Sequence, residues 1–185
     1  SQKRVPAIFM RGGSSKGVFF HSSDLPEDKN SWDELFLSVL GSPDPYGRQL
    51  TGMGGGISSL SKAVVISPPT RLDADVDYTF AQISVKDSVV DYSSNCGNLS
   101  SAVGPFAIDT GLVDASGSKK EVRIHNTNSG KLIVSKVPLR DGLSEVVGDL
   151  SSPGVSGTGA KVPLDFLDPG GTRTGSLLPT GNTVD

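Results

Sequence analysis

One segment, from Gly97 to Asp109, is apolar on nearly every side of a helix, and it constrains the fold more than any other part of the chain. Five of its apolar positions make one helical face, Ile108 adds apolar surface on another side, and polar residues are sparse until Asp109; the face carries Leu99, Ala102, Val103, Phe106 and Ala107. A helix that is apolar nearly all round belongs in the interior of a protein. Pro105 should kink this helix or tighten its end, and Gly111 is the expected cap.

Most of the remaining apolar runs are short and rich in β-branched residues, with frequent glycine (23) and proline (12) between them. This pattern predicts strands joined by turns. We expect strands over 5–10, 18–21, 62–66, 78–85, 89–92, 122–125, 132–137 and 162–167. Loops are expected over 12–17, 43–56 and 151–159, and a hairpin turn over 126–131.

A second helix is predicted after residue 31. Ser31 and Glu34 have the spacing of a capping box, in which each side chain binds a backbone amide of the other. Leu35, Val39 and Leu40 follow at helical spacing, and the next residue is a glycine that should end the helix. We expect this helix to lie at the surface.

The composition excludes several classes of function. The chain has 185 residues, 35% hydrophobic and 20% charged, as in folded globular proteins of one large or two small domains. Its net charge of −3 offers no basic excess for nucleic acid or a membrane surface. No apolar run approaches the length of a membrane span. The sequence therefore indicates neither a nucleic-acid nor a membrane partner.

Cysteine and histidine are too few for a disulfide framework or a zinc centre. One cysteine cannot form an internal disulfide, and His21 and His125 lack metal-ligand spacing. We therefore expect no metal and a reducing, cytoplasmic setting. His125 lies in an alternating strand pattern, where a structural histidine is the simpler interpretation than a catalytic one.

Cys96 is the first candidate for chemistry because it directly precedes the buried helix. The positive end of a helix lowers the pKa of a thiol and attracts carboxylates. Asn95, Gly97 and Asn98 surround it, and polar or glycine neighbours suit a ligand-facing turn. The alternative is a cysteine that is simply buried in the core.

Lys62 is the second candidate. It follows the glycine-rich segment 54–61 and begins an apolar strand, where partial removal from water would favour a neutral amine that can act as a base. The alternative is an ordinary solvated lysine. Ser59 and Lys62 also match the S-x-x-K motif of serine acyl-enzymes, but a strand follows at once and the companion motifs are absent.

The segment 11–17 is the third candidate. Arg11, Ser15 and Lys16 lie among small residues in a turn that can bind carboxylates, although the spacing of a phosphate loop is not met. A plain hairpin turn is the alternative.

Taken together, four blocks in order resemble the PrpF family of 2-methylaconitate cis–trans isomerases, methylitaconate isomerases, oxalomesaconate tautomerases and aconitate isomerases. The blocks are residues 9–20, 52–62, 94–107 and 175–182. The resemblance implies an α+β, diaminopimelate epimerase-like fold, in which a curved mixed sheet or barrel wraps a central buried helix. It also implies an active site in a cleft between two such domains, and activity without a cofactor.

By the same resemblance, Lys62 is the expected base and Cys96 the expected thiol in a proton-shift isomerisation of an aconitate-like polycarboxylic acid. Ser15, Asn95, Gly97 and Asn98 are the expected carboxylate donors. Arg11 and Lys16 are expected as possible substrate-binding cations, or alternatively as solvent-facing residues.

Family members are about twice as long as this chain, which implies an N-terminal domain over 1–169 and a linker over 170–185 toward a second domain. The expected partners are the polycarboxylate substrate, that missing domain and, in a homo-oligomer, another copy of the protein. The competing hypothesis is a non-catalytic domain that binds a partner domain or a carboxylate ligand without turnover.

Overall fold

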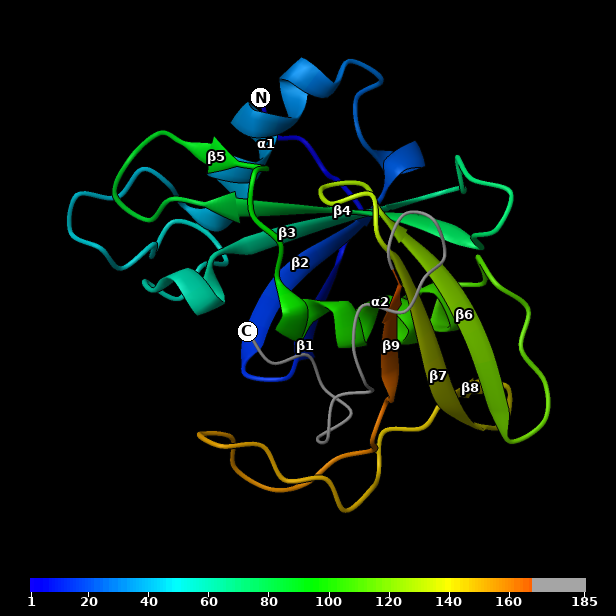
Figure 1. Cartoon of the computed structure of the whole chain (residues 1–185). Helices are drawn as coiled ribbons and strands as arrows, with labels where there is room; N and C mark the ends of the chain where they lie inside the picture. The colour runs from blue at the N-terminus through cyan, green and yellow to red at the C-terminus, as the bar shows by residue number, and fades with distance from the viewer. Residues whose placement is uncertain (168–185) are drawn as a thin grey trace.

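The computed structural model describes residues 1–167, in which a curved sheet surrounds one central helix (Figure 1). The strands are β1 (Ile8–Gly12), β2 (Ser15–His21), β3 (Lys62–Ser67), β4 (Val76–Ile83), β5 (Val90–Asp91), β6 (Lys119–Asn126), β7 (Leu132–Arg140), β8 (Leu143–Ser144) and β9 (Leu164–Leu167). The helices are α1 (Trp32–Leu40) and α2 (Gly97–Asp109), with 3₁₀ turns at Ser22–Asp24, Lys29–Ser31 and Ser58–Leu60.

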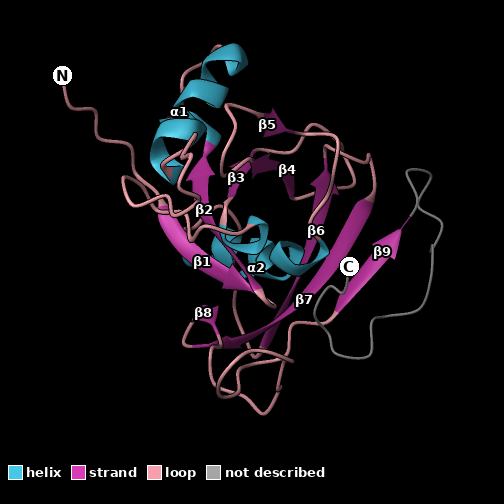
Figure 2. Cartoon of the chain, turned by 90° about the vertical axis from the view of Figure 1, so that its left-hand side faces the viewer, coloured by secondary structure: helices cyan, strands magenta, loops and turns pink. Residues whose placement is uncertain are grey.

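The sheet is mixed. Its strand order is β1-β2-β3-β4-β6-β7-β8, with β5 paired to β4 and β9 paired to β7. The pairs β2–β3 and β4–β6 are parallel, and the other pairs are antiparallel. Viewed from the side, the strands bend around α2 (Figure 2). The predicted curved mixed sheet around a central helix is therefore confirmed.

Helix α2 is as buried as its sequence predicts. Nine of its 13 residues are buried, and they pack with the inner-facing residues of β2, β3, β4, β6 and β7. The helix continues through Pro105 to Asp109. Gly111 follows in the left-handed region at φ +80°, and its amide donates to the carbonyl of Ile108, so it helps to end the helix as expected.

Helix α1 covers the outer face of β2, β3 and β4. It buries Trp32, Phe36 and Leu40 in a second core that includes Val18, Phe20 and Val65. Gly41 ends it in the left-handed conformation at φ +84°, as predicted.

The predicted capping box at the start of α1 is wrong. Ser31 has helical backbone angles and its side chain makes no capping bond. The reason is that the chain enters α1 from the 3₁₀ turn Lys29–Ser31, and the carboxylate of Asp28 caps that turn instead by accepting from the amide of Asn30 at 3.0 Å.

The N-terminal hairpin is tighter than predicted. Residues 12–17 were expected to form a loop, but β1 and β2 pair as far as Gly12 opposite Ser15, which leaves a turn of two residues. Gly13 makes this turn possible because its φ of +55° suits glycine at the first turn position. The first strand therefore covers 8–12 instead of 5–10.

The remaining strand boundaries shift by at most three residues. Strand β4 covers 76–83 instead of 78–85, and it pairs with β5, which falls within the strand expected over 89–92. Strand β8 was not predicted.

The expected linker over 170–185 and the block 175–182 lie outside the described residues. Within residues 1–167, no helix combines the length and the hydrophobicity that a bilayer span requires.

Candidate active site

Cys96 is the N-cap residue of α2. Its side chain is buried, with 3% of its surface exposed. Its carbonyl accepts from the amide of Ser100 at 3.3 Å, from the Ser100 hydroxyl at 3.0 Å and from the Tyr78 hydroxyl at 3.4 Å. These bonds fix the helix start against β4, so the thiol is held at the positive end of the helix dipole.

The β1–β2 turn packs directly on this helix end. A Cβ at Gly12 would lie 2.5 Å from the carbonyl oxygen of Asn98 and 2.9 Å from the Cα of Leu99. Only glycine allows that approach of backbone to backbone. The contact brings the buried Ser15 hydroxyl to 3.9 Å from the Sγ of Cys96, within reach of a weak hydrogen bond from the thiol.

Lys62 begins β3 on the sheet face that meets α2. Its side chain is 8% exposed, and its Nζ donates to the Oε1 of Gln82 at 2.8 Å. Nζ also lies 5.1 Å from the centre of the Phe80 ring. Phe80 belongs to the same core cluster as Cys96, which places the lysine beside the core that carries the thiol.

Gly17 lies between the start of β3 at Lys62 and the first turn of α2 after Cys96. It lies on β2 beside Lys62, on the same face as Ser15. A Cβ at this position would be 3.0 Å from the Cδ1 of Leu99 and 3.2 Å from the carbonyl oxygen of Lys62. The absence of a side chain therefore lets the first turn of α2 approach the start of β3.

Three blocks that are distant in sequence thus converge at one end of α2. The β1–β2 turn, the start of β3 and the helix start lie on the same side of the molecule (Figure 1). The structure therefore places the buried Ser15 and Cys96 in contact, and Gly17 lies between the first turn of α2 and the backbone of the buried Lys62. Asn95 is exposed beside them, and Gly97 and Asn98 are half-buried in the first turn.

Arg11 and Lys16 have a different orientation. They pair across the hairpin and are exposed, on the face opposite to Ser15, because successive strand residues point to opposite sides. The Arg11 guanidinium donates to the Gly13 carbonyl at 3.0 Å, and the Lys16 ammonium lies 5.6 Å from the Phe9 ring. Their exposure agrees with the solvent-facing alternative.

The loop before Lys62 is held in place by hydrogen bonds to the side chain of Gln49. Gln49 is fully buried, and its backbone has a φ of +55°. Its Nε2 donates to the hydroxyls of Ser42 (2.9 Å) and Ser61 (2.7 Å), and its Oε1 accepts from the Gly56 amide (3.0 Å). The Ser61 hydroxyl in turn donates to the Ile83 carbonyl at 2.8 Å. This network ties the residue before Lys62 to β4.

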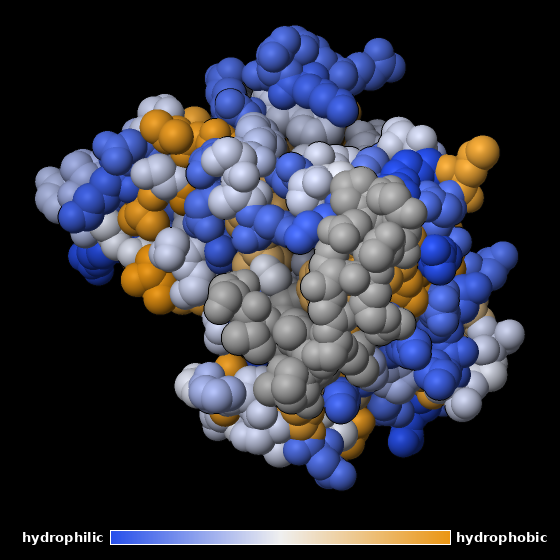
Figure 3. All heavy atoms as spheres, in the orientation of Figure 1, coloured by the Kyte–Doolittle hydropathy of each residue, from blue (hydrophilic) through white to orange (hydrophobic). Residues whose placement is uncertain are grey.

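Asp44 folds the first part of the same loop. Its carboxylate accepts from the backbone amides of Tyr46, Gln49 and Arg48 at 2.7–3.0 Å. These amides, with Tyr46 contributing most, hold the pKa of Asp44 below its ordinary value of 3.8. The tip of the loop is more exposed, and Figure 3 shows apolar side chains at this edge of the molecule; the exposed large hydrophobic residues of the loop are Tyr46, Leu50, Met53 and Ile57.

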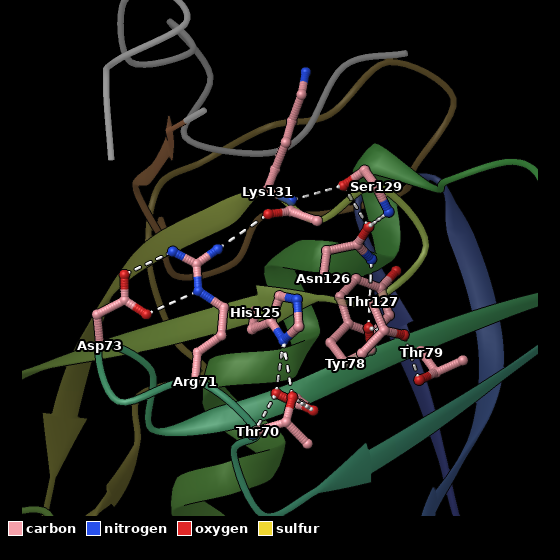
Figure 4. Close-up of polar contacts among 12 residues, drawn as sticks. Thr70, Arg71, Asp73, Tyr78, Thr79, His125, Asn126, Thr127, Ser129 and Lys131 are labelled. Carbon is pink, nitrogen blue, oxygen red and sulfur yellow. Dashed lines mark hydrogen bonds and ion pairs between the residues drawn. The ribbon is translucent and has the colours of Figure 1, made fainter. Parts of the chain in front are cut away.

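His125 lies in a structural network at the far end of β4 and β6, as its strand pattern suggested. Its Nδ1 is 2.9 Å from the Oδ1 of Asp77, and the Thr70 hydroxyl donates to the other oxygen of that carboxylate at 2.6 Å (Figure 4). Asp77 and His125 are partners in the β4–β6 register. Their contact supports this strand pairing.

Within residues 1–167, no cluster of three or more histidine, cysteine or acidic side chains has an arrangement that could hold a metal ion.

Sequence reasoning missed Gln49, Tyr78 and Gln82, which support the candidate residues. Glutamine and tyrosine are ordinary in loops and strands, and only the β3–β4 register places Gln82 opposite Lys62.

Comparison with known proteins gives a family and close relatives. A model of the PrpF family, described as "PrpF protein", matches residues 2–185. The chain is 50% identical to the 3-methylitaconate isomerase of Eubacterium barkeri, over all of this chain and 48% of that protein. It is 49% identical to a 2-methyl-aconitate isomerase of Cupriavidus necator, over all of this chain and 49% of that protein. The chain therefore spans about half the length of these relatives.

Solved structures confirm the predicted fold. A crystal structure of methylitaconate-delta-isomerase superposes with a TM-score of 0.85 at 49% identity, covering 89% of this chain and 42% of the other. A probable proline racemase from Agrobacterium radiobacter gives a TM-score of 0.53 at 14% identity, covering 88% and 41%. The second likeness concerns the fold alone and supports the epimerase-like architecture.

Proposed function

The chain belongs to the PrpF family, and from that premise we propose that its protein isomerises an unsaturated polycarboxylic acid by a proton shift, with Lys62 as the base and Cys96 as a thiol at the reacting centre. The observation that carries the proposal is the convergence of a buried lysine, a buried cysteine and a buried serine at the N-terminal end of one central helix. Perturbed or reactive groups concentrated at such a site are typical of catalysis.

The proposed reaction begins when the neutral amine of Lys62 removes a proton from the carbon next to the alkene. The electron pair left behind delocalises over the alkene and the adjoining carboxylate. Return of a proton to the far carbon of this system moves the double bond, whereas rotation followed by return to the original carbon gives cis–trans isomerisation. Cys96 lies beside the same core and is the second group that can carry a proton.

Substrate carboxylates would be held at the helix end. The amides of the first turn of α2 and the positive end of its dipole favour an anion there. We assign Ser15, Asn95, Gly97 and Asn98 to this role, because all four lie at or beside the start of the helix. Donors in this position would also stabilise the negative charge that develops on the carboxylate during proton removal.

The substrate class is proposed from the relatives, which are named for 3-methylitaconate and 2-methyl-aconitate. Both are small unsaturated acids with several carboxylates. Because the chain spans about half of each relative, we also propose that a second domain supplies the facing wall of the site. We propose no cofactor, since a base, a thiol and anion donors suffice for a proton shift.

The test uses the full-length protein in D₂O, with methylitaconate, methylaconitate, cis-aconitate and oxalomesaconate supplied separately and followed by proton NMR. We expect deuterium uptake at the allylic carbon and formation of the isomer for at least one acid. Folded full-length protein that neither exchanges a proton nor forms an isomer with any of these acids would contradict the proposal and favour a non-catalytic binding role.

A further inference from the structure

Gln82 makes three hydrogen bonds around Lys62. Its side-chain carbonyl oxygen, Oε1, accepts from the Nζ of Lys62 at 2.8 Å. Its side-chain amide nitrogen, Nε2, donates to the backbone carbonyls of Ser58 and Ser61, both at 2.9 Å. Gln82 is half-buried on β4 and is the direct cross-strand partner of Lys62 in the β3–β4 register.

These contacts allow only one orientation of the amide. If the amide were turned by 180°, Oε1 would face the carbonyl oxygens of Ser58 and Ser61, and neither of these two contacts would have a hydrogen to share. The carbonyls of Ser58 and Ser61 are themselves placed by the 3₁₀ turn Ser58–Leu60 and by the bond of the Ser61 hydroxyl to β4. Gln82 therefore presents a fixed acceptor to Lys62.

We propose that Gln82 is the positioning residue of Lys62: its amide aims the lysine nitrogen without adding a charge that would hold it protonated. This inference rests on the proposed role of Lys62 as the base. A base that is oriented by a third group is a recurring feature of catalytic sites, because the reacting atoms must be aligned for rapid proton transfer.

The acceptor that Gln82 presents to Lys62 carries no charge, and this affects which form of the lysine is favoured. Within residues 1–167, no carboxylate forms an ion pair with Lys62. A carboxylate at the Gln82 position would favour the ammonium form, which has no lone pair to accept a proton. An amide oxygen can accept one N–H from a neutral amine, which leaves the lone pair of that amine available to the substrate.

Two variants of the full-length protein test separately whether Gln82 orients Lys62 and whether the lack of charge at Gln82 matters. Gln82→Glu should move the acid limb of the pH profile of kcat/KM upward by about one pH unit or more, since an adjacent opposite charge favours the protonated lysine. Gln82→Met keeps the length of the side chain but removes both the acceptor for Lys62 and the donor to the carbonyls of Ser58 and Ser61. It should lower kcat by about 10- to 100-fold with little change in KM, as expected when a reacting group is misaligned.

Competitive acylation of Lys62 across a pH series, read by peptide mass spectrometry, gives the titration midpoint of the lysine without any need for turnover. Gln82→Glu should move this midpoint upward as well. The matched control is Gln2→Glu, which adds the same charge at an exposed position and should move neither the midpoint nor the pH profile. Circular dichroism and thermal melting establish that each variant is folded.

The outcomes distinguish this inference from the proposed function. Undiminished turnover in Lys62→Ala would overturn the role of the base and the inference with it. An inactive Lys62→Ala, combined with an unmoved midpoint in folded Gln82→Glu and an unchanged kcat in Gln82→Met, would overturn the role of Gln82 alone.

Discussion

The position of Cys96 in the chain places its thiol at the start of the central helix. The thiol lies at the N-terminal end of α2, and the Ser15 hydroxyl is the side-chain group placed 3.9 Å from it. The positive end of a helix dipole favours a bound carboxylate. Cys96 therefore lies where the anion of the proposed reaction would be held.

Replacement of Cys96 by serine tests whether the thiol takes part in the reaction. A hydroxyl keeps the size and polarity of the side chain but ionises far less readily, so kcat of the full-length protein should fall by about 10- to 100-fold. The measurement is kcat and kcat/KM of the folded variant, and values identical to those of the wild type would leave Cys96 with a structural role.

At the scale of elements, the site depends on two close approaches at glycines, of which the one at Gly12 brings backbone against backbone and admits glycine alone. The β1–β2 turn lies against the start of α2 at Gly12, and β2 lies against the start of β3 at Gly17. Both approaches bring segments that are far apart in sequence to one helix end. The glycines of the first motif are thus needed for the contact between elements.

Gly12→Ala should prevent the β1–β2 hairpin from packing closely against the start of α2. The added Cβ would meet backbone atoms of Asn98 and Leu99 at 2.5 and 2.9 Å, which cannot yield as a flexible side chain would. We expect a loss of about 1–3 kcal/mol in the free energy of unfolding, measured by urea denaturation. Gly159→Ala is the matched control, because its Cβ would have only ordinary contacts at 3.6 Å and beyond. Equal stability of the two variants would contradict the role given to this contact.

The loop that leads to Lys62 should contribute less to the stability of the fold at low pH, because Asp44 then becomes protonated. Its pKa is lowered in the folded protein by amides of the loop, so its contribution to stability is complete above its ordinary value of 3.8 and is lost as the pH falls through the lower folded value. The difference in unfolding free energy between the wild type and Asp44→Asn should therefore shrink below about pH 4. Asp114→Asn, at an exposed position, is the charge control. A difference that stays constant from pH 3 to pH 7 would contradict this.

The whole molecule shows which features of the fold can be predicted from local sequence. The buried helix α2 was predictable because its composition leaves no polar face, and Gly41 and Gly111 marked helix ends. The family motifs also pointed to Ser15, Lys62 and Cys96 before their positions were known.

Strand register, by contrast, is a property of the assembled sheet. A loop over 12–17 would have left the direction of Arg11 and Lys16 open, but the two-residue turn at Gly13 fixes the register that turns both outward. Gln82 has no local signal at all. It becomes the partner of Lys62 only because β3 and β4 pair with those two residues opposite each other.

The central claim is that Lys62 removes the proton. The most direct test compares the wild-type and Lys62→Ala forms of the full-length protein for the rate at which the allylic proton of methylitaconate exchanges with D₂O, with Lys136→Ala as the control at an exposed lysine. The account predicts that exchange falls by about 10²- to 10⁴-fold in Lys62→Ala, the usual contribution of a general base, and that the control exchanges as the wild type does. Exchange at the wild-type rate by folded Lys62→Ala would contradict it.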